Sequence, residues 1–199
     1  MDINEHVKSR SERLIAAWPR PARQAEYPAL VAVTGLPVSG KSFFARALAL
    51  RSPIAVLSSD QVRMQLTDGA PRYDGPEHAH VFNVLGRLTK VLLAEGYHVL
   101  VDATGIRARD RRASLLAARE QGLRTAIVWC EVNEQVAAIR LAARAAGTDS
   151  LDYSQADASV RARMAARGSR PAPSEADLIM LVNPDTMALR IEELAAWLG

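Results

Sequence analysis

One eight-residue segment constrains this chain more than any other. Residues 35–42 read Gly-Leu-Pro-Val-Ser-Gly-Lys-Ser, which matches the pattern Gly-x-x-x-x-Gly-Lys-Ser/Thr. An apolar run at 30–33 precedes the segment, and a stretch of helical character at 42–50 follows it. In this context the backbone N–H groups of a glycine-containing loop curl around a phosphate, and the helix N-terminus adds partial positive charge. The segment therefore predicts a phosphate-binding loop rather than a chance turn.

This loop supplies the candidate nucleotide-binding residues. Lys41 can reach the β- and γ-phosphate oxygens, and the hydroxyl of Ser42 can bind Mg²⁺. The other loop positions assigned to the nucleotide are Gly35, Pro37, Val38, Ser39, Gly40 and Phe43. We therefore expect a nucleotide, ATP, and Mg²⁺ as the ligands.

Short apolar runs alternate with helical segments along the chain. Strands are expected at 30–33, 54–57, 98–101, 125–130 and 178–182. Helices are expected at 2–18, 42–50, after 58–60, and at 80–95, 109–121, 135–146 and 187–198. Such alternation predicts an α/β P-loop fold with a five-stranded, mostly parallel sheet and helices on both faces.

The sequence predicts an N-terminal segment followed by one domain. Residues 1–29 are interpreted as an N-terminal helix and linker, and 30–199 as the nucleotide-binding domain. Within that domain, a polar segment at about 148–175 carries four arginines and one short helix starting near Ser154. Its length and composition are typical of a lid.

Composition excludes several classes of protein. Hydrophobic residues make up 49% and charged residues 24%, as in soluble globular proteins. Cys130 is the only cysteine, so no disulfide can form within the chain. No apolar run approaches the roughly 20 residues that span a bilayer, and no secretory signal is visible. We therefore expect a cytoplasmic protein without a membrane partner. The net charge of +3 does not by itself indicate nucleic-acid binding.

The residues after the third strand favour transfer over hydrolysis. Asp102 ends that strand and can hold the Mg²⁺ shell. Ala103 follows, at the position where ring ATPases and transporters usually carry a glutamate that activates water. The chain also lacks the Asn-Lys-x-Asp element that reads guanine. Transfer of a phosphoryl group to an acceptor other than water is therefore favoured.

A second set of residues follows the second strand. The carboxyl ends of parallel strands and the phosphate loop share one sheet edge, so Asp60 is expected to face the γ-phosphate and could accept a proton from an attacking hydroxyl. Arg63, one helical turn on, could hold an anionic part of the acceptor. The alternatives are a helix N-cap for Asp60 and a solvated helix face for Arg63.

Arginines near the lid are candidates for stabilising the transferring phosphoryl group. Arg140 and Arg144 are four residues apart and share a helix face, although the pair could simply be exposed. The sequence does not rank the lid arginines Arg161, Arg163, Arg167 and Arg170. Residues 77–80, Glu-His-Ala-His, are interpreted as solvated residues near a helix start rather than as a metal site.

Taken in order, these motifs resemble a known family. The phosphate loop, Ser59-Asp60-x-x-Arg63, residues 101–104 and the Arg140/Arg144 pair are similar to those of small P-loop kinases of the polynucleotide-kinase-like group, with AAA_33-type ATP-binding domains. Zeta toxins and chloramphenicol phosphotransferases are more distant relatives. The resemblance covers about residues 30–198.

The resemblance implies a role for several positions. It makes Asp60 the general base, places Arg63 on a phosphate of the acceptor strand, and places Arg144 on the ATP phosphates. Thr104 and Arg107 match the family segment Asp-Ala-Thr-x-x-Arg and are expected to bind substrate, and Asn183 falls near the adenine. Two departures stand out: Val38 replaces the usual loop glycine, and Met164 replaces a common lid glutamine.

The expected function is ATP-dependent transfer of the γ-phosphoryl group to a hydroxyl. The acceptor is either a polynucleotide 5′-hydroxyl or a small molecule. Aromatic residues are only 5% of the chain, which weakens the nucleic-acid alternative because few rings are available for stacking. The alternative function is an ATP-binding regulatory or switch module. Residues 1–29 could also pair two chains as a homodimer.

Overall fold

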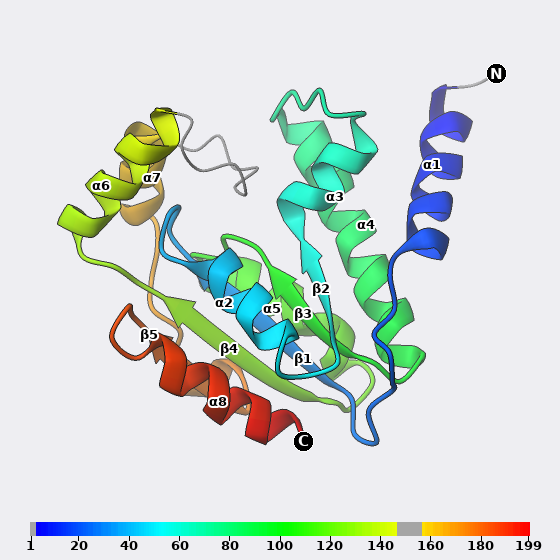
Figure 1. Ribbon diagram of the computed structural model, residues 1–199. Coiled ribbons are helices and arrows are strands. Elements are labelled where there is room, and N and C mark those ends of the chain that lie inside the picture. Colours follow the sequence, from blue (N-terminus) through cyan, green and yellow to red (C-terminus); the bar gives the residue numbers. More distant parts are fainter. Residues whose placement is uncertain (1–2, 147–156) are drawn as a thin grey trace.

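A five-stranded parallel sheet forms the centre of the molecule (Figure 1). The computed structural model describes residues 3–146 and 157–199. The strands are β1 (Ala29–Gly35), β2 (Ile54–Ser58), β3 (His98–Asp102), β4 (Arg124–Cys130) and β5 (Leu178–Val182). They lie in the order β2-β3-β1-β4-β5, and every neighbouring pair is parallel. The expected fold class is confirmed.

Helices cover both faces of the sheet (Figure 1). On one face lie α2 (Lys41–Ala49) and α8 (Met187–Leu198), and on the other lie α4 (Gly75–Ala94) and α5 (Ala108–Arg119). Side chains of β1 alternate between the two cores: Leu30 and Ala32 pack with α4 and α5, whereas Val31 and Val33 pack with α2 and α8. Burial on both faces explains why this strand is a continuous apolar run.

The remaining helices gather at the carboxyl edge of the sheet or against its flank. These are α1 (Ile3–Ala17), α3 (Ser59–Leu66), α6 (Glu134–Ala145) and α7 (Ala158–Ala165), and a 3₁₀ turn at Pro173–Glu175 precedes β5. Helix α1 packs on α3 and α4, where Ile15 and Trp18 enter the core. Arg20 ties the end of this segment to Glu95 by an ion pair of 3.0 Å. The N-terminal helix is therefore joined to the helices that follow β2.

The start of helix α4 differs from the sequence expectation. Helix α4 begins at Gly75 instead of 80, because Asp74 caps it by accepting a hydrogen bond from the Glu77 N–H at 2.8 Å. The lid helix α7 begins at Ala158, where Asp157 is the cap. Ser154, the expected start of that helix, lies outside the described residues, as does much of the expected lid.

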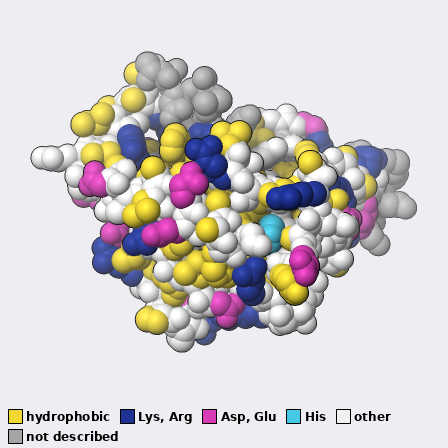
Figure 2. All heavy atoms as spheres, turned by 60° about the horizontal axis from the view of Figure 1, so that its bottom comes forward, with side chains coloured by type: hydrophobic (Ala, Val, Ile, Leu, Met, Phe, Trp, Pro, Cys, Tyr) yellow, Lys and Arg dark blue, Asp and Glu magenta, His cyan; other side chains and the backbone are white. Residues whose placement is uncertain are grey.

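Charges on the surface are mixed. Figure 2 shows one face of the molecule, on which basic and acidic side chains are interspersed among hydrophobic ones. None of the helices in the described part of the chain is long and apolar enough to cross a membrane.

Candidate nucleotide and acceptor site

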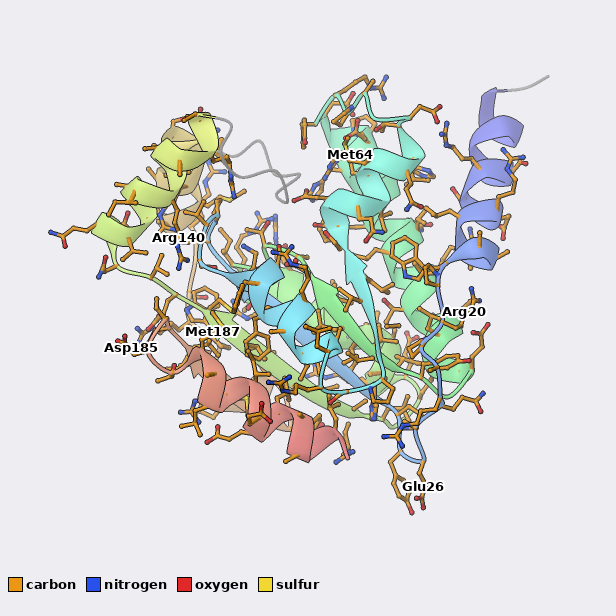
Figure 3. All side chains as sticks on the ribbon, in the orientation of Figure 1. Arg20, Glu26, Met64, Arg140, Asp185 and Met187 are labelled. Atoms are coloured by element: carbon orange, nitrogen blue, oxygen red, sulfur yellow. The ribbon has the colours of Figure 1, made fainter. Side chains whose placement is uncertain are left out.

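The candidate site lies at the carboxyl edge of the sheet. Strands β3 and β2 lie on one side of β1, and β4 and β5 lie on the other side. The strand order therefore reverses at β1. Open α/β sheets form a crevice at such a point. Here a cavity of about 920 Å³ is lined by the phosphate loop and by residues of α3, α4, α6 and α7. Figure 3 shows Met64 of α3 and Arg140 of α6 on opposite sides of this edge.

Backbone geometry in the phosphate loop explains its glycines. Gly35 has φ of 143°, and a side chain there would run into the carbonyl oxygen of Cys130. Gly40 has φ of 99° and is the N-cap of α2. Both conformations favour glycine. Val38 also lies in the left-handed region, with φ of 59°, so the departure from glycine at this position strains the backbone.

Three cationic side chains contact the turn of the loop. The Nζ of Lys41 donates a hydrogen bond to the Leu36 carbonyl at 2.9 Å. Arg140 donates to the Val38 carbonyl at 2.9 Å, and Arg161 donates to the Pro37 carbonyl at 2.7 Å. Arg161 is buried and is held by Glu134 at 2.8 Å. Of the four lid arginines that the sequence could not rank, Arg161 is the one fixed against the loop.

Ser42 and Asp102 meet beside the loop. The Ser42 hydroxyl donates a hydrogen bond to Oδ2 of Asp102 at 2.7 Å. Hydroxyl and carboxylate oxygens suit Mg²⁺, which usually completes its shell with substrate phosphates and water. The pair therefore fits the expected Mg²⁺ position. The described residues contain no group of three or more His, Cys, Asp or Glu side chains that could hold a metal ion by themselves.

Asp60 lines the cavity opposite the loop. The N-cap of α3 is Ser58, whose hydroxyl accepts a hydrogen bond from the Gln61 N–H at 3.4 Å. The alternative assignment of Asp60 as that cap is therefore wrong. Its carboxylate stands one turn before Arg63 on a helix that begins directly at the end of β2.

Arg63 is not on a solvated helix face. Its side chain lines the cavity, is only 5% exposed, and forms an ion pair of 2.5 Å with Glu77. Glu77 is 7% exposed, so the expectation of a solvated Glu77 is also wrong. The sequence gives no sign of this pair because α3 and α4 are joined by a loop whose path brings the two residues together.

Glu77 is the centre of a buried hydrogen-bond network. Its Oε2 accepts a hydrogen bond from the Arg72 N–H at 2.7 Å, and its Oε1 accepts from the Tyr73 N–H at 3.3 Å and from Arg63. Burial alone would raise the pKa of Glu77, but the Arg72 N–H and the Arg63 guanidinium outweigh burial and lower this pKa below its ordinary value. Glu77 is therefore a carboxylate at neutral pH.

Not every expected site residue lines the cavity. Those that do are Pro37, Val38, Gly40, Lys41, Ser42, Phe43, Asp60, Arg63, Asp102, Thr104, Arg140 and Arg144. Gly35 and Ser39 lie in the loop but are buried. Arg107 is outside the lining and pairs with Asp110 at 2.7 Å. Asn183 is also outside the lining: its side chain accepts a hydrogen bond from the Thr186 N–H at 2.9 Å, while Pro184 and Met187 line the cavity.

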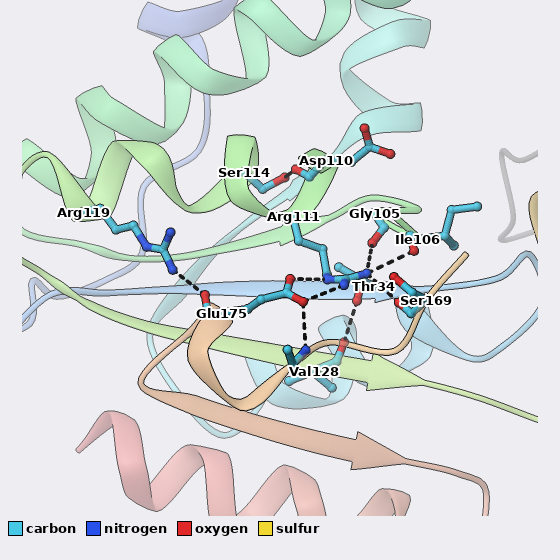
Figure 4. Close-up of polar contacts among 11 residues, drawn as sticks. Thr34, Gly105, Ile106, Asp110, Arg111, Ser114, Arg119, Val128, Ser169 and Glu175 are labelled. Carbon is cyan, nitrogen blue, oxygen red and sulfur yellow. Dashed lines mark hydrogen bonds and ion pairs between the residues drawn. The ribbon is translucent and has the colours of Figure 1, made fainter. Parts of the chain in front are cut away.

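A second network joins the segment after β3 to the return from the lid region (Figure 4). Arg111, on α5, is fully buried and forms a two-pronged ion pair with Glu175, with both contacts at 2.8 Å. It also donates to the carbonyls of Gly105, Ile106 and Ser169. Sequence reasoning missed Arg111, because one arginine in an Arg-rich helix gives no signal of burial.

Cys130 has no chemical role at this site. It is buried at the end of β4, and burial raises the pKa of its thiol to about 12. A thiol that stays protonated is a poor nucleophile.

Comparisons with known proteins identify the family and the fold. The sequence model of a family described as an AAA domain, AAA_33, matches residues 30–171. None of the curated proteins matches the chain. A protein assigned as a kinase from Chloroflexus aurantiacus has a similar structure, with a TM-score of 0.68 and 19% identity over 87% of this chain and 100% of that one.

Two liganded structures are also similar. Kti12 of Chaetomium thermophilum, in complex with ADP-AlF3, has a TM-score of 0.66 and 16% identity over 85% of this chain and 99% of that one. The APS kinase CysC of Mycobacterium tuberculosis, in complex with AMPPNP and APS, has a TM-score of 0.60 and 22% identity over 85% of this chain and 96% of that one. These similarities show that the chain has the fold of P-loop kinases.

Proposed function

Because the chain belongs to the AAA_33 family of P-loop proteins, we propose that it is a kinase that transfers the γ-phosphoryl group of ATP to a hydroxyl. One observation carries the proposal. The phosphate loop, the Ser42–Asp102 pair and Asp60 all border the same cavity. A site for phosphate and a carboxylate that can take a proton therefore face one space, which is the minimum that phosphoryl transfer to an alcohol requires.

The residues have distinct tasks in this mechanism. Lys41 leaves the Leu36 carbonyl and binds the β- and γ-phosphates, which offer it a full negative charge instead of a partial one. Asp60 accepts the proton of the attacking hydroxyl. The acceptor oxygen bonds to the γ-phosphorus, the bond from that phosphorus to the bridging oxygen breaks, and ADP leaves. Arg140 and Arg144 stabilise the negative charge on the transferring group.

Ser42 and Asp102 would hold Mg²⁺. When bound, the ion neutralises charge on the β- and γ-phosphate oxygens. Ala103, next to Asp102, has no group that can activate water. The absence of a carboxylate at that position supports transfer to an alcohol over hydrolysis.

Three further assignments belong to this proposal. Residues 30–199 form the kinase domain, the segment at about 148–175 acts as its lid, and Thr104, which lines the cavity, contributes to substrate binding. The protein works in the cytoplasm. The alternative of a regulatory module that binds ATP without an acceptor shares the phosphate loop but gives Asp60 no task.

Substitution of Asp60 separates the kinase from the regulatory module. We expect Asp60→Asn to lower the rate of transfer from γ-labelled ATP by about 100-fold or more, because a general base contributes about that much, while the affinity for an ATP analogue changes little. Asp185→Asn is the matched control, because Asp185 is exposed near the C-terminal helix. The acceptors to screen are small alcohols and 5′-hydroxyl oligonucleotides. An Asp60→Asn protein that transfers label at the normal rate would overturn the proposal.

A further inference from the structure

One wall of the cavity differs in character from the phosphate loop. It comprises Asp60 and Arg63 of α3, Tyr73 of the loop before α4, and His78 and Phe82 of α4, and we call these five residues the acceptor wall. Three of the five carry rings. Two of them, Tyr73 and Phe82, are among the ten Phe, Trp and Tyr residues of the chain.

The cation of the acceptor wall is already neutralised. Arg63 and Glu77 have side chains that are 7% and 5% exposed, and their ion pair is 2.5 Å long. Screening by water is weak at such burial, and the two side chains together form a pair with no net charge. Burial and the nearby Arg63 lower the pKa of His78, so that ring is neutral at pH 7.

The neighbouring arginines also have carboxylate partners. Arg107 pairs with Asp110 at 2.7 Å, and Arg72 pairs with Asp74 at 3.2 Å. The cations of α2 and α6 that line the cavity are Lys41, Arg46, Arg140 and Arg144, and none of them is part of the acceptor wall. Because its one arginine is paired with Glu77, the acceptor wall offers no uncompensated cation to a phosphate placed against it.

The aromatic rings of the acceptor wall determine what kind of group can pack against it. The Arg63 guanidinium lies 5.0 Å from the centre of the Tyr73 ring, which is 43% exposed. His78 and Phe82 have ring centres 4.5 Å apart. The Nε–H of Arg63 is buried and has no hydrogen-bond partner among the described residues. A flat ring can pack on such a surface.

Tyr73 is held in place by Glu77. Its φ of 56° lies in the left-handed region, which is costly for a bulky residue. Two hydrogen bonds from the N–H groups of Arg72 and Tyr73 to Glu77 fix this turn. Glu77 therefore sets both the charge of Arg63 and the position of the ring beside it.

We infer that the acceptor is an uncharged alcohol that carries a flat ring, and that Glu77 determines this specificity by neutralising Arg63. The inference rests on the proposed function and narrows its acceptor to a small molecule without phosphate. It gives Arg63 a different part from the one that the family resemblance implies: the guanidinium stacks on Tyr73 and is neutralised by Glu77. A polynucleotide end, which carries phosphates beside its terminal hydroxyl, is disfavoured.

Equilibrium binding tests this inference without turnover. The protein is first loaded with AMPPNP and Mg²⁺, and the loading is followed by calorimetry. Three alcohols are then titrated: uridine, uridine 3′-monophosphate and methyl riboside. They share a 5′-hydroxyl and differ only in the phosphate or the ring. We expect uridine to bind about tenfold more tightly than either of the others.

Glu77→Gln tests the source of the specificity. The amide keeps the shape of the side chain but leaves the charge of Arg63 unpaired. The affinity for uridine 3′-monophosphate should therefore rise about tenfold relative to the affinity for uridine. Glu12→Gln is the control, because Glu12 forms an exposed pair with Arg87. If Glu77→Gln does not fold, Tyr73→Ala replaces it. This variant should bind uridine more weakly and bind methyl riboside with unchanged affinity.

The outcomes are separable. Tighter binding of uridine 3′-monophosphate than of uridine to the wild-type protein would overturn the inference, as would equal binding of uridine and methyl riboside. Failure of all three to bind at about 10 mM would also overturn it. In each of these cases successful loading with AMPPNP leaves the proposed kinase function standing, whereas failure of the loading step itself counts against that function.

Discussion

Val38 shows how a single residue can depart from the pattern of its loop. Its φ of 59° is unfavourable for a β-branched side chain and costs about 1–2 kcal/mol. The sequence shows that valine replaces the usual glycine at this position, but the strain is visible only in the backbone angle. The carbonyl of Val38 accepts a hydrogen bond from Arg140, which holds the turn in place.

Replacing Val38 by glycine should relieve that strain. We expect Val38→Gly to leave the free energy of unfolding unchanged or to raise it by up to about 1 kcal/mol, because relief of strain offsets the greater freedom of glycine in the unfolded chain. Val160→Gly, within helix α7 and also at the cavity, should instead lower it by about 1 kcal/mol. Urea unfolding measures both. Equal destabilisation by the two substitutions would show that Val38 is unstrained.

The Glu77 network also gives the molecule a pH dependence. The pKa of Glu77 is lower in the folded protein than its ordinary value of 4.5, so the network stabilises the fold above that pH. The stabilisation is lost as the pH falls through the lowered pKa. In Glu77→Gln there is no such charge to lose, and its free energy of unfolding should fall less steeply below about pH 4.5. Urea titrations at several acidic pH values measure the slope. Identical slopes for the variant and the wild type would contradict this account of Glu77.

At the scale of elements, Arg111 binds three segments into one unit. It joins α5 to the segment after β3, which leads from Thr104, and to Ser169 and Glu175 on the return from the lid region. Its guanidinium also lies 5.6 Å from the centre of the Trp129 ring on β4. The network holds the base of the lid region against the sheet edge.

Removal of this guanidinium should be severely destabilising. We expect Arg111→Ala to lower the free energy of unfolding by about 3–5 kcal/mol, because Glu175 loses its partner and three carbonyls lose a donor. The neighbouring Arg112 is exposed, and Arg112→Ala should cost less than about 0.5 kcal/mol. Thermal unfolding of the two variants compares them directly. Similar midpoints would mean that the Arg111 network contributes little.

Local pattern predicted the elements well where apolar residues mark them. The five strands are short apolar runs, and the structure has a strand at each of them. The start of α4 was missed because its first turn, from Gly75, has no large apolar residue before Val81. Two residues do mark this helix start: Asp74 is its cap, and Pro76 lies in its first turn. Such capping residues are recognised by residue type and place, and they do not contribute to the apolar periodicity.

Across the whole protein, the sequence predicted the phosphate loop better than the contacts of Arg63 and Arg161 around it. The phosphate loop is contiguous, so its residues are adjacent in any fold that forms the turn. The burial of Arg63 against Glu77 and of Arg161 against Pro37 joins residues 14 and 124 positions apart. Such pairs depend on how helices pack, and residue type alone does not reveal them. Net charge likewise gave no hint that most arginines of the site have carboxylate or carbonyl partners.

The packing of the N-terminal segment could not be predicted from residue type either. Ile15 and Trp18 are buried in the core that includes α4, although the AAA_33 match begins only at residue 30. Arg20 holds the following turn to Glu95. Helix α1 thus stiffens the helices that carry the acceptor wall, which is a role the sequence left open.

Calorimetric titration of the whole protein with AMPPNP, in the presence and absence of Mg²⁺, tests whether the loop after β1 binds a nucleotide. We expect binding that Mg²⁺ tightens, that Lys41→Ala weakens by about tenfold or more, and that Asp102→Asn makes insensitive to Mg²⁺. No heat of binding, or binding that neither substitution changes, would show that the loop after β1 does not hold a nucleotide.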